Sequence, residues 1–234
     1  MDLGSSVSII IPTWNEAANI GELLALIHKL PGQNSLKEVI VCDGSSTDNT
    51  VLLAKANGAV VIHSPQRQRA YQMNLGAKHA TGDILYFLHA DSTPPAQTLL
   101  CIVEKSKNGF ASGCFRLKFD VSNWFLRTQT WFTKFPQTVF RFGDQSLFVS
   151  RELFQNIGGY NENLFLMEDQ EIIYRIKKRG KFLVMKHVII TSSRKYQING
   201  FLRLQLIFYT IYFLYHLGLS QKQLKLLYQK WITT

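Results

Sequence analysis

Short apolar runs alternate with longer amphipathic stretches in the first part of the chain. The apolar runs that predict strands are residues 7–11, 38–43, 59–63 and 84–88. Runs of this length, bounded by Gly, Pro or polar turns, are typical of strands buried on both faces of a parallel sheet. Apolar residues at helical spacing predict the helices between them, at residues 17–30, 49–57 and 69–80. This alternation predicts a right-handed α/β sheet, a nucleotide-binding half of the Rossmann type.

The second part of the chain has a different, less regular pattern. Strands are expected at residues 114–119 and, after Gly143-Asp144-Gln145, up to Val149, with one or two more within 182–190. Helices are expected at residues 95–107 and 123–135, from Arg151, from Glu168, and from about Ile198 and Gln221. We find no internal repeat, linker or low-complexity tract. We therefore expect one domain over residues 1–234, in three parts: about 5–108, about 109–197 and about 198–234.

Composition places the chain among globular proteins with one core. Of its 234 residues, 46% are hydrophobic and 18% are charged, which argues against disorder. The net charge of +10 comes from 26 Lys and Arg against 16 Asp and Glu. Such an excess suits nucleotide phosphates, acidic lipids or nucleic acid, but scattered surface lysines give the same total. Because the basic residues form no continuous run with interleaved aromatics, we expect no nucleic-acid binding.

Cysteine usage and hydropathy suggest a cytoplasmic protein. Cys42, Cys101 and Cys114 are odd in number and far apart, which fits a reducing compartment without zinc or a disulfide framework. No signal-peptide pattern precedes the first strand. The continuous apolar run at 206–215 is much shorter than the roughly 20 residues that span a bilayer, so no transmembrane helix is expected.

The segment at residues 201–219 nevertheless needs a partner for its apolar surface. Residues 206–215 are apolar around most of a helix, and such a helix must be buried in a core, in a homodimer interface or at a membrane surface. Nearby Arg and Lys would favour anionic headgroups. A peripheral position at the inner membrane face therefore stays open beside core or dimer contact.

The candidate chemistry consists of acids at strand ends. Neither a Gly-x-Gly-x-x-Gly turn nor a Walker lysine loop is present. The sequence therefore lacks the main motifs of a dinucleotide-dependent oxidoreductase and of a kinase with a Walker loop. Glu16, Asp43 and Asp91 follow predicted strands, whose carboxyl ends form the ligand crevice of open α/β sheets. Asp43 could accept hydrogen bonds from a ribose or base, and Trp14 offers a flat face for stacking. Alternatively, Asp43 forms a turn before Gly44, and Asp91 caps the next helix.

Several segments together resemble family-2 glycosyltransferases of the GT-A fold. The motifs that carry the resemblance are SIIIPTWNE at 8–16, VCDGSSTD at 41–48 and HAD at 89–91. The similarity continues through RAYQMNLG at 69–76, GDQ at 143–145, LMED at 166–169 and SRKY at 193–196. Within that family the chain most resembles a small bacterial branch labelled arsenosugar-biosynthesis or radical-SAM/selenodomain-associated glycosyltransferases. The resemblance covers nearly the whole chain.

The resemblance implies a donor site in the first half, residues 5–108. The residues implied for the nucleotide base and ribose are Pro12 through its backbone, Trp14, Glu16, Asp43, Ser45 and Arg69. Asp91 matches the last acid of the Asp-x-Asp motif, which binds Mn²⁺ or Mg²⁺ and stabilises the departing diphosphate. His89 stands where the first acid is usual. Either it shifts the preference towards Mn²⁺, or it contacts ribose or phosphate and leaves Asp91 as the sole protein ligand.

The second half, residues 109–197, is implied to hold the acceptor and the catalytic base. Asp169 matches the family's general base on the acceptor hydroxyl, and Glu168 would orient it. Alternatively, both acids only favour the start of their helix through its dipole. Asp144 and Gln145 are implied to shape the sugar or acceptor site. Arg194 resembles a residue that contacts the diphosphate when a loop closes.

The expected function is therefore an inverting, hexosyl-type glycosyltransferase that takes sugar from a UDP-linked donor. The acceptor hydroxyl could belong to a small molecule or a lipid. A nucleotidyltransferase is less favoured, because it would need a basic, glycine-rich first loop in place of PTWNE at 12–16. A non-catalytic or lipid-associated nucleotide-binding relative stays open because of His89.

Overall fold

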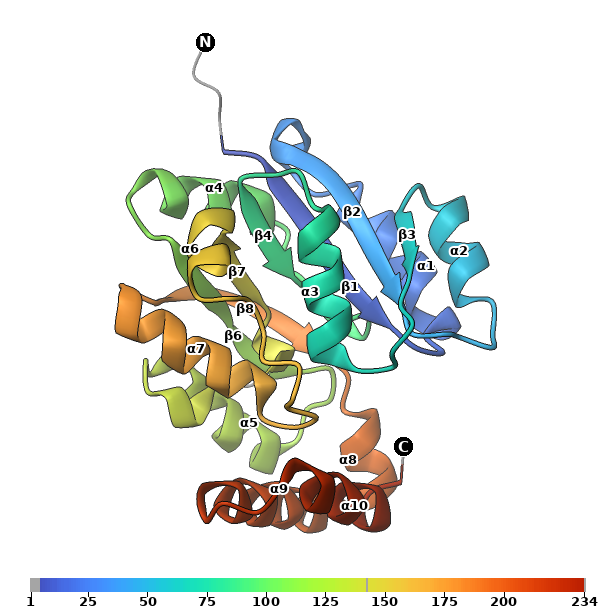
Figure 1. The fold of residues 1–234 in the computed structure, drawn as a ribbon, viewed down its shortest axis with the longest axis vertical. Coiled ribbons are helices and arrows are strands. Elements are labelled where there is room, and N and C mark those ends of the chain that lie inside the picture. The colour runs from blue at the N-terminus through green and yellow to red at the C-terminus, as the bar shows by residue number, and fades with distance from the viewer. Residues whose placement is uncertain (1–4, 142, 234) are drawn as a thin grey trace.

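The computed structural model describes residues 5–141 and 143–233, which form a layered α/β fold (Figure 1). Its first half contains β1 (Val7–Thr13), α1 (Ala17–Ile27), β2 (Leu36–Asp43), α2 (Thr50–Ala56), β3 (Val60–His63), α3 (Arg69–His79), β4 (Ile84–Phe87), β5 (Ser92–Thr93) and α4 (Thr98–Lys107). The four strands and four helices predicted for this half are confirmed. The two-residue strand β5, which pairs with the distant β8, was not predicted.

The second half follows the predicted order with one addition. It contains β6 (Ser112–Phe119), α5 (Trp124–Trp131), β7 (Leu147–Ser150), α6 (Arg151–Asn156), α7 (Glu168–Arg179), β8 (Leu183–Thr191), α8 (Arg194–Asn199), α9 (Phe201–His216) and α10 (Gln221–Trp231). Short 3₁₀ turns lie at Gln33–Ser35, Phe132–Lys134, Thr138–Phe140 and Gly143–Gln145. The extra helix is α8, which Gly200 separates from α9 with a φ of 80°.

One mixed sheet runs through both predicted halves. Its strand order is β3-β2-β1-β4-β7-β6-β8-β5. β3, β2, β1 and β4 are parallel, whereas β7 is antiparallel to both β4 and β6. Because parallel strands end at the same edge, the polar segments after β1, β2 and β4 are brought together. This confirms the placement on which the predicted site depends.

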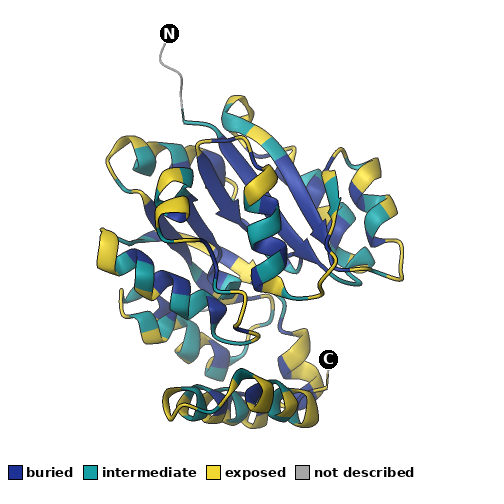
Figure 2. Ribbon diagram, in the orientation of Figure 1, coloured by how far each residue is buried: buried dark blue, intermediate teal, exposed yellow. Residues whose placement is uncertain are grey.

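Helices cover both faces of the sheet, and each face has its own core. β1 shows why: Val7, Ile9 and Ile11 enter the core with α1 and α4, while Ile10 enters the core with α3, α6 and α7. Alternate residues of a strand point to opposite faces, so an uninterrupted apolar strand serves both cores. Figure 2 shows the strands as the buried centre of the molecule.

The C-terminal helices form a separate layer. In Figure 1, α9 and α10 lie side by side beyond the carboxyl ends of the parallel strands, below α5 and α8. Among the helices of the described residues, none combines the length and the apolarity that crossing a bilayer requires.

We expect Gly76→Ala to destabilise the fold. A Cβ at Gly76 would lie 2.5 Å from Ile10 Cγ2 and 2.8 Å from Cys42 Sγ, in the packed interface between α3 and the sheet. Overpacking of this kind costs about 1–3 kcal/mol, more than alanine's better helix propensity returns. Urea unfolding of both proteins measures the change. Gly180→Ala is the control, because its Cβ would meet nothing within 4 Å; equal stability of all three proteins would contradict the packing argument.

Candidate active site

The loops after β1 and β2 are joined into one rigid edge. Ser46 Oγ accepts a hydrogen bond from the Asn15 N–H at 2.9 Å, and Asn15 Oδ1 accepts one from the Thr47 N–H at 2.9 Å. The Glu16 N–H donates to Thr50 Oγ1 at 2.8 Å. These bonds fix where Trp14 and Glu16 emerge from the sheet.

Asp43 is used mainly inside this edge. Its carboxylate accepts hydrogen bonds from Thr13 Oγ1 at 3.1 Å, from the Ser46 N–H at 2.8 Å and from Ser46 Oγ at 2.5 Å. Asp43 is only 1% exposed, whereas Ser45 beside it is exposed with a φ of 67°. The contacts are those of the turn-forming alternative. Contact of Asp43 with a ribose or base stays a prediction, as does that of Ser45.

Trp14 is stacked against a residue that the sequence did not single out. The guanidinium carbon of Arg67 lies 2.8 Å from the centroid of the Trp14 ring. An arginine over an aromatic face is a cation–π contact. One face of Trp14 is therefore covered by a cationic side chain from the loop before α3. The buried Pro12 lies within β1, opposite Cys42 of β2.

Arg69 connects the two halves of the molecule. It begins α3, and its Nε lies 3.3 Å from Oε1 of Glu168, which begins α7. Glu168 is 2% exposed, and its Oε1 makes no hydrogen bond of good geometry among the described residues. A buried carboxylate is tolerated when a cation compensates it, so this pair holds α7 next to α3.

His89 is paired with Asp144. Nδ1 of His89 lies 3.2 Å from Oδ1 of Asp144. Burial alone would lower the pKa of His89, but the hydrogen bond and charge of Asp144 outweigh it and raise that pKa. Burial alone would raise the pKa of Asp144. The hydrogen bond and charge of His89 outweigh it and lower the pKa of Asp144 to about 2.

The environment of Asp169 raises its pKa, whereas that of Asp144 lowers it. Burial raises the pKa of its carboxyl to about 6, and the charge of Glu168 adds to the shift, while Arg69 and His89 oppose it. Asp169 lies in the first turn of α7 and lines one small cavity with His89, Gly143 and Tyr160. A carboxyl with a pKa near 6 is poised to accept a proton near neutral pH.

Gly143 allows these groups to approach one another. A Cβ on Gly143 would collide with the Asp169 carboxylate and lie 2.8 Å from His89 Cε1. On the other side of Asp169, Met167 caps α7 with a left-handed φ of 71°. Positive φ at a residue with a side chain is strained and persists where the surroundings impose it. The position of Asp169 is thus fixed from both sides.

Asp91 is the candidate metal ligand, and it has a free carboxylate. Its backbone oxygen accepts a hydrogen bond from the Ser192 N–H at 3.1 Å, but no described residue hydrogen-bonds or ion-pairs with its side chain. Glu16 lies nearby: burial and then the charge of Asp91 raise the pKa of Glu16, against Asn19, Arg194 and Lys195.

The residues present fit a divalent cation shared with a diphosphate. No cluster of three or more His, Cys, Asp or Glu within the described ranges could hold an ion by protein ligands alone. Mg²⁺ is often bound by one or two carboxylates together with phosphate oxygens and water, which needs no such cluster. Asp91 has this free carboxylate, whereas Nδ1 of His89 is occupied by Asp144.

Gln145 is buried, whereas Arg194 is exposed. Gln145 is 1% exposed; its amide donates to Phe140 O at 2.5 Å and accepts from Arg141 Nη1 at 2.7 Å. These contacts hold the loop before Asp144, so the predicted contact of Gln145 with sugar or acceptor has no support from its position. Arg194 is exposed at the start of α8 and acts electrostatically on Glu16.

Sequence reasoning missed three residues around this site: Arg67, Tyr160 and Gln221. Gln221 begins α10, and its Oε1 accepts hydrogen bonds from the N–H groups of Phe165 and Leu166 at 3.0 and 3.2 Å. It thereby holds the loop that leads to Asp169. No motif marks these residues, because their contacts join segments far apart in sequence.

Known proteins of similar sequence match part of the chain. A dolichol-phosphate mannosyltransferase of Pyrococcus furiosus is 33% identical over 109 residues, 44% of this chain and 30% of that protein. An undecaprenyl-phosphate 4-deoxy-4-formamido-L-arabinose transferase of Klebsiella pneumoniae is 31% identical over 113 residues, 44% of this chain and 34% of that protein. The matched segment thus spans about a third of these relatives.

Solved structures resemble a larger share of the chain. The mannosyltransferase PcManGT of Pyrobaculum calidifontis, in complex with GDP-Man and Mn²⁺, superposes with a TM-score of 0.66 at 22% identity. The match covers 81% of this chain and 57% of that one. S. aureus TarS with UDP-GlcNAc gives a TM-score of 0.65 at 18% identity, over 80% of this chain and 58% of that one.

These likenesses confirm the predicted GT-A fold. At such identities they establish the fold alone, and the family rests on the sequence. The model of Glycosyl transferase family 2 matches residues 8–164, from β1 through the loop before α7. That segment includes the strand ends and the pair of His89 and Asp144. The chain belongs to glycosyl transferase family 2.

Proposed function

We propose that the chain is an inverting glycosyltransferase whose general base is Asp169. One observation carries the proposal: Asp169 is a carboxyl with a pKa raised to about 6, held beside His89 at the edge where the parallel strands end. General bases are most effective when their pKa lies near the working pH. The cluster also gives the neighbouring Asp144 a pKa of about 2, so the two acids have separate roles.

The donor is a nucleotide-sugar, UDP-linked in our proposal. The first half supplies Trp14, Glu16, Arg69 and the joined loops after β1 and β2. Arg67 would move from Trp14 when a base stacks there, since both would use the same ring face. Structures of similar fold are complexes with GDP-Man and with UDP-GlcNAc, so the fold admits either nucleotide.

A divalent cation, Mn²⁺ or Mg²⁺, would be held by Asp91 together with the donor's diphosphate. When bound, it would stabilise the charge that develops on the departing nucleoside diphosphate. Arg194 and Lys195, near Glu16 at the same edge, would add positive charge there. His89, paired with Asp144, would contact donor oxygens through its other ring nitrogen.

The transfer itself needs one proton acceptor. Asp169 removes the proton of the acceptor hydroxyl, whose oxygen attacks the anomeric carbon of the sugar. The bond from that carbon to the diphosphate oxygen breaks, and the nucleoside diphosphate leaves with the electron pair. Attack opposite the leaving group inverts the anomeric centre. Glu168 and Arg69 keep the Asp169 carboxylate in position.

The acceptor and the branch are finer parts of the proposal. We propose a hexosyl transfer to a hydroxyl of a small molecule or a lipid. The arsenosugar-biosynthesis or radical-SAM/selenodomain-associated branch is part of the proposal through the resemblance of the segments at 69–76, 143–145, 166–169 and 193–196. Arg69, Asp144, Asp169 and Arg194 of these segments border the candidate site.

Asp169→Asn should abolish transfer without weakening donor binding. Loss of a positioned general base lowers kcat by about 10²–10⁴-fold, whereas Asp169 makes no contact proposed for the nucleotide. Nucleoside diphosphate release and calorimetric titration with UDP measure the two effects. Glu104→Gln, an exposed acid on α4, is the charge-matched control. Unchanged kcat in Asp169→Asn would remove Asp169 from the mechanism.

The rate should depend on pH through Asp169. Because burial raises its pKa to about 6, the carboxyl is protonated below that pH and cannot accept the hydroxyl proton. We expect kcat/KM to rise as pH increases through about 6 and then to level off. The profile is measured from pH 5 to 8 with saturating Mn²⁺. A profile that is flat over this range would contradict the assignment.

Asp91→Ala should remove metal-dependent nucleotide binding. Calorimetric titrations with UDP, GDP and dTDP, each with Mn²⁺, with Mg²⁺ and with EDTA, identify the donor nucleotide. We expect UDP to bind in a metal-dependent manner, and this dependence to vanish in Asp91→Ala but not in Glu22→Ala, which removes an exposed acid from α1. Failure of every nucleotide to bind the wild-type protein would refute the donor site.

A further inference from the structure

The C-terminal part of the chain carries positive charge without any compensating acid. After Glu171 the sequence contains no Asp or Glu up to residue 234, although it contains many Lys and Arg. The same holds for residues 121–143, which include α5. These two segments meet in space: Tyr209 Oη of α9 donates a hydrogen bond to Gln129 Oε1 of α5 at 2.8 Å.

The surface of these helices is also unusually apolar. The exposed apolar residues along α9 are Leu202, Leu206, Tyr209 and Phe213, with Leu217 at its C-cap, and each is between 51% and 65% exposed. Their spacing of three and four places them along one side of the helix. On α5, Trp124 is 76% and Trp131 is 53% exposed. We call these seven residues together with Arg127 the α5–α9 face; Figure 2 shows how much of the C-terminal layer is exposed.

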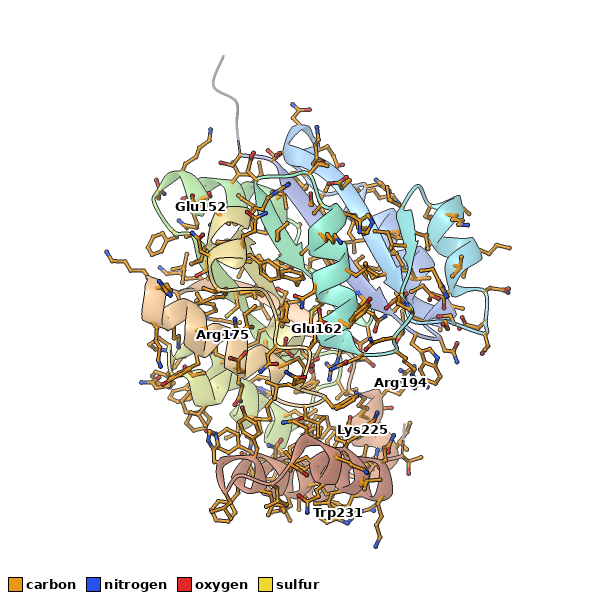
Figure 3. All side chains as sticks on the ribbon, in the orientation of Figure 1. Glu152, Glu162, Arg175, Arg194, Lys225 and Trp231 are labelled. Atoms are coloured by element: carbon orange, nitrogen blue, oxygen red, sulfur yellow. The ribbon has the colours of Figure 1, made fainter. Side chains whose placement is uncertain are left out.

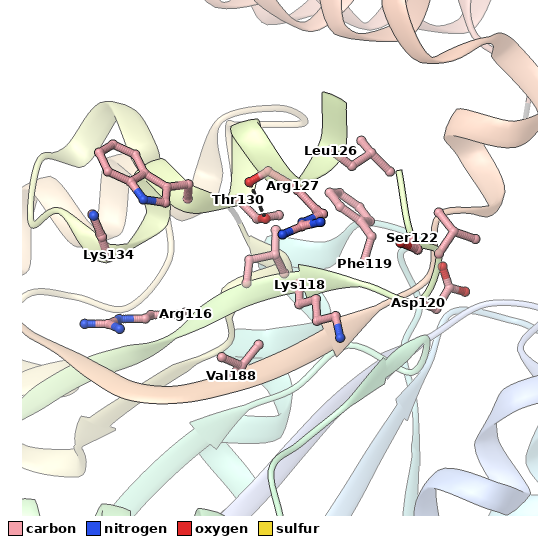
Figure 4. A pocket seen from close by; sticks show the side chains of 13 residues that line it. Arg116, Lys118, Phe119, Asp120, Ser122, Leu126, Arg127, Thr130, Lys134 and Val188 are labelled. Atoms are coloured by element: carbon pink, nitrogen blue, oxygen red, sulfur yellow. Dashed lines mark hydrogen bonds between the residues drawn. The ribbon is translucent and has the colours of Figure 1, made fainter. Parts of the chain in front are cut away.

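A cationic groove borders the α5–α9 face. It lies between α5 and the strands β6 and β8, has a volume of about 630 Å³, and is lined by Arg116, Lys118, Arg127 and Lys134 (Figure 4). Its one acid, Asp120, accepts a hydrogen bond from the Ser193 N–H at 2.9 Å. Nε of Arg116 is buried without a hydrogen-bond partner. A groove with this donor set suits a phosphate group.

We propose that the α5–α9 face docks onto an anionic lipid bilayer, with lipid phosphates seated in the groove. Apolar side chains beside Lys and Arg are the pattern of helices that lie in the membrane interface. Each basic residue near an anionic leaflet adds about tenfold or less to the affinity. Here four basic residues face the single acid Asp120 in the groove. Trp124 and Trp131 suit the headgroup region, where amphipathic rings accumulate.

Charge selects a lipid surface over a second copy of this chain. A two-fold dimer through the α5–α9 face would place the same cation-rich segments against each other. Neither copy has an acid in these segments to compensate them. An anionic leaflet supplies the missing negative charge.

Helix α10 connects the docked layer to the candidate active site. Gln221 holds the Phe165 and Leu166 N–H groups, and Lys225 Nζ lies 3.9 Å from the centroid of the Phe165 ring. Figure 3 labels Lys225 on this layer. The loop that leads to Asp169 thus contacts α10, which packs against α9 of the docked face. The docking itself needs no donor and stands independently of the proposed reaction.

Sedimentation with lipid vesicles tests this docking without any substrate. Wild-type protein should sediment with vesicles of phosphatidylcholine and phosphatidylglycerol, but much less with phosphatidylcholine alone. Arg127→Gln/Lys134→Gln should weaken binding about thirtyfold, from the loss of two interfacial cations. Leu206→Ser/Phe213→Ser should weaken it about tenfold or more. Lys29→Gln/Lys37→Gln, at the opposite end of the molecule, should bind like wild type. Circular dichroism confirms that each variant is folded.

Three outcomes would overturn the proposal. The first is absence of wild-type binding to the anionic vesicles at low salt. The second is a dimer in sedimentation equilibrium that Leu206→Ser/Phe213→Ser dissociates, which would assign the face to a second copy. The third is complete displacement from vesicles by millimolar inorganic phosphate, which would assign the groove to a soluble phosphate ligand. Calorimetric titration with UDP in the same variants keeps a failure of docking distinct from a failure of the donor site.

Discussion

The ion pair between Arg69 and Glu168 is the contact on which the site depends. It joins the first residue of α3 to the first residue of α7, and these helices pack into the same core. Glu168 is buried and would carry an uncompensated charge without Arg69, which is strongly destabilising. The pair therefore fixes the start of α7, and with it Asp169, against the half of the molecule that carries the nucleotide motifs.

Backbone strain collects around the same place. Within the described ranges, the residues other than glycine with positive φ are Asn15, Ser45, Ser146 and Met167. They lie after β1, after β2, next to Gln145 and before α7, so each belongs to a segment that borders the candidate site. Such conformations cost about 1–3 kcal/mol each and persist where surrounding contacts impose them. Here the joined loops and the Arg69–Glu168 pair supply those contacts.

Sequence predicted most of the architecture because the parallel strands are buried on both faces. Their short apolar runs located β1 to β4, and the polar motifs after them located the edge where ligands bind. β5 and α8 were missed, since a two-residue strand and a one-turn helix have no period to detect. Arg67 over Trp14 and Gln221 under the α7 loop were missed as well, because tertiary contacts alone define them. Gln145 was expected to shape the sugar or acceptor site, and a motif does not reveal that its side chain is buried.

The environment of each acid, rather than its residue type, separates the roles at this edge. Asp144 faces His89 and stays ionised. Asp169, across Gly143, is half-buried next to a second carboxylate and holds its proton to higher pH. Asp91 lies apart with a carboxylate that no described side chain engages. A transfer that expels a diphosphate needs one acid to hold a cation and another to take a proton, and Asp91 and Asp169 differ in environment in the way that this division of roles requires.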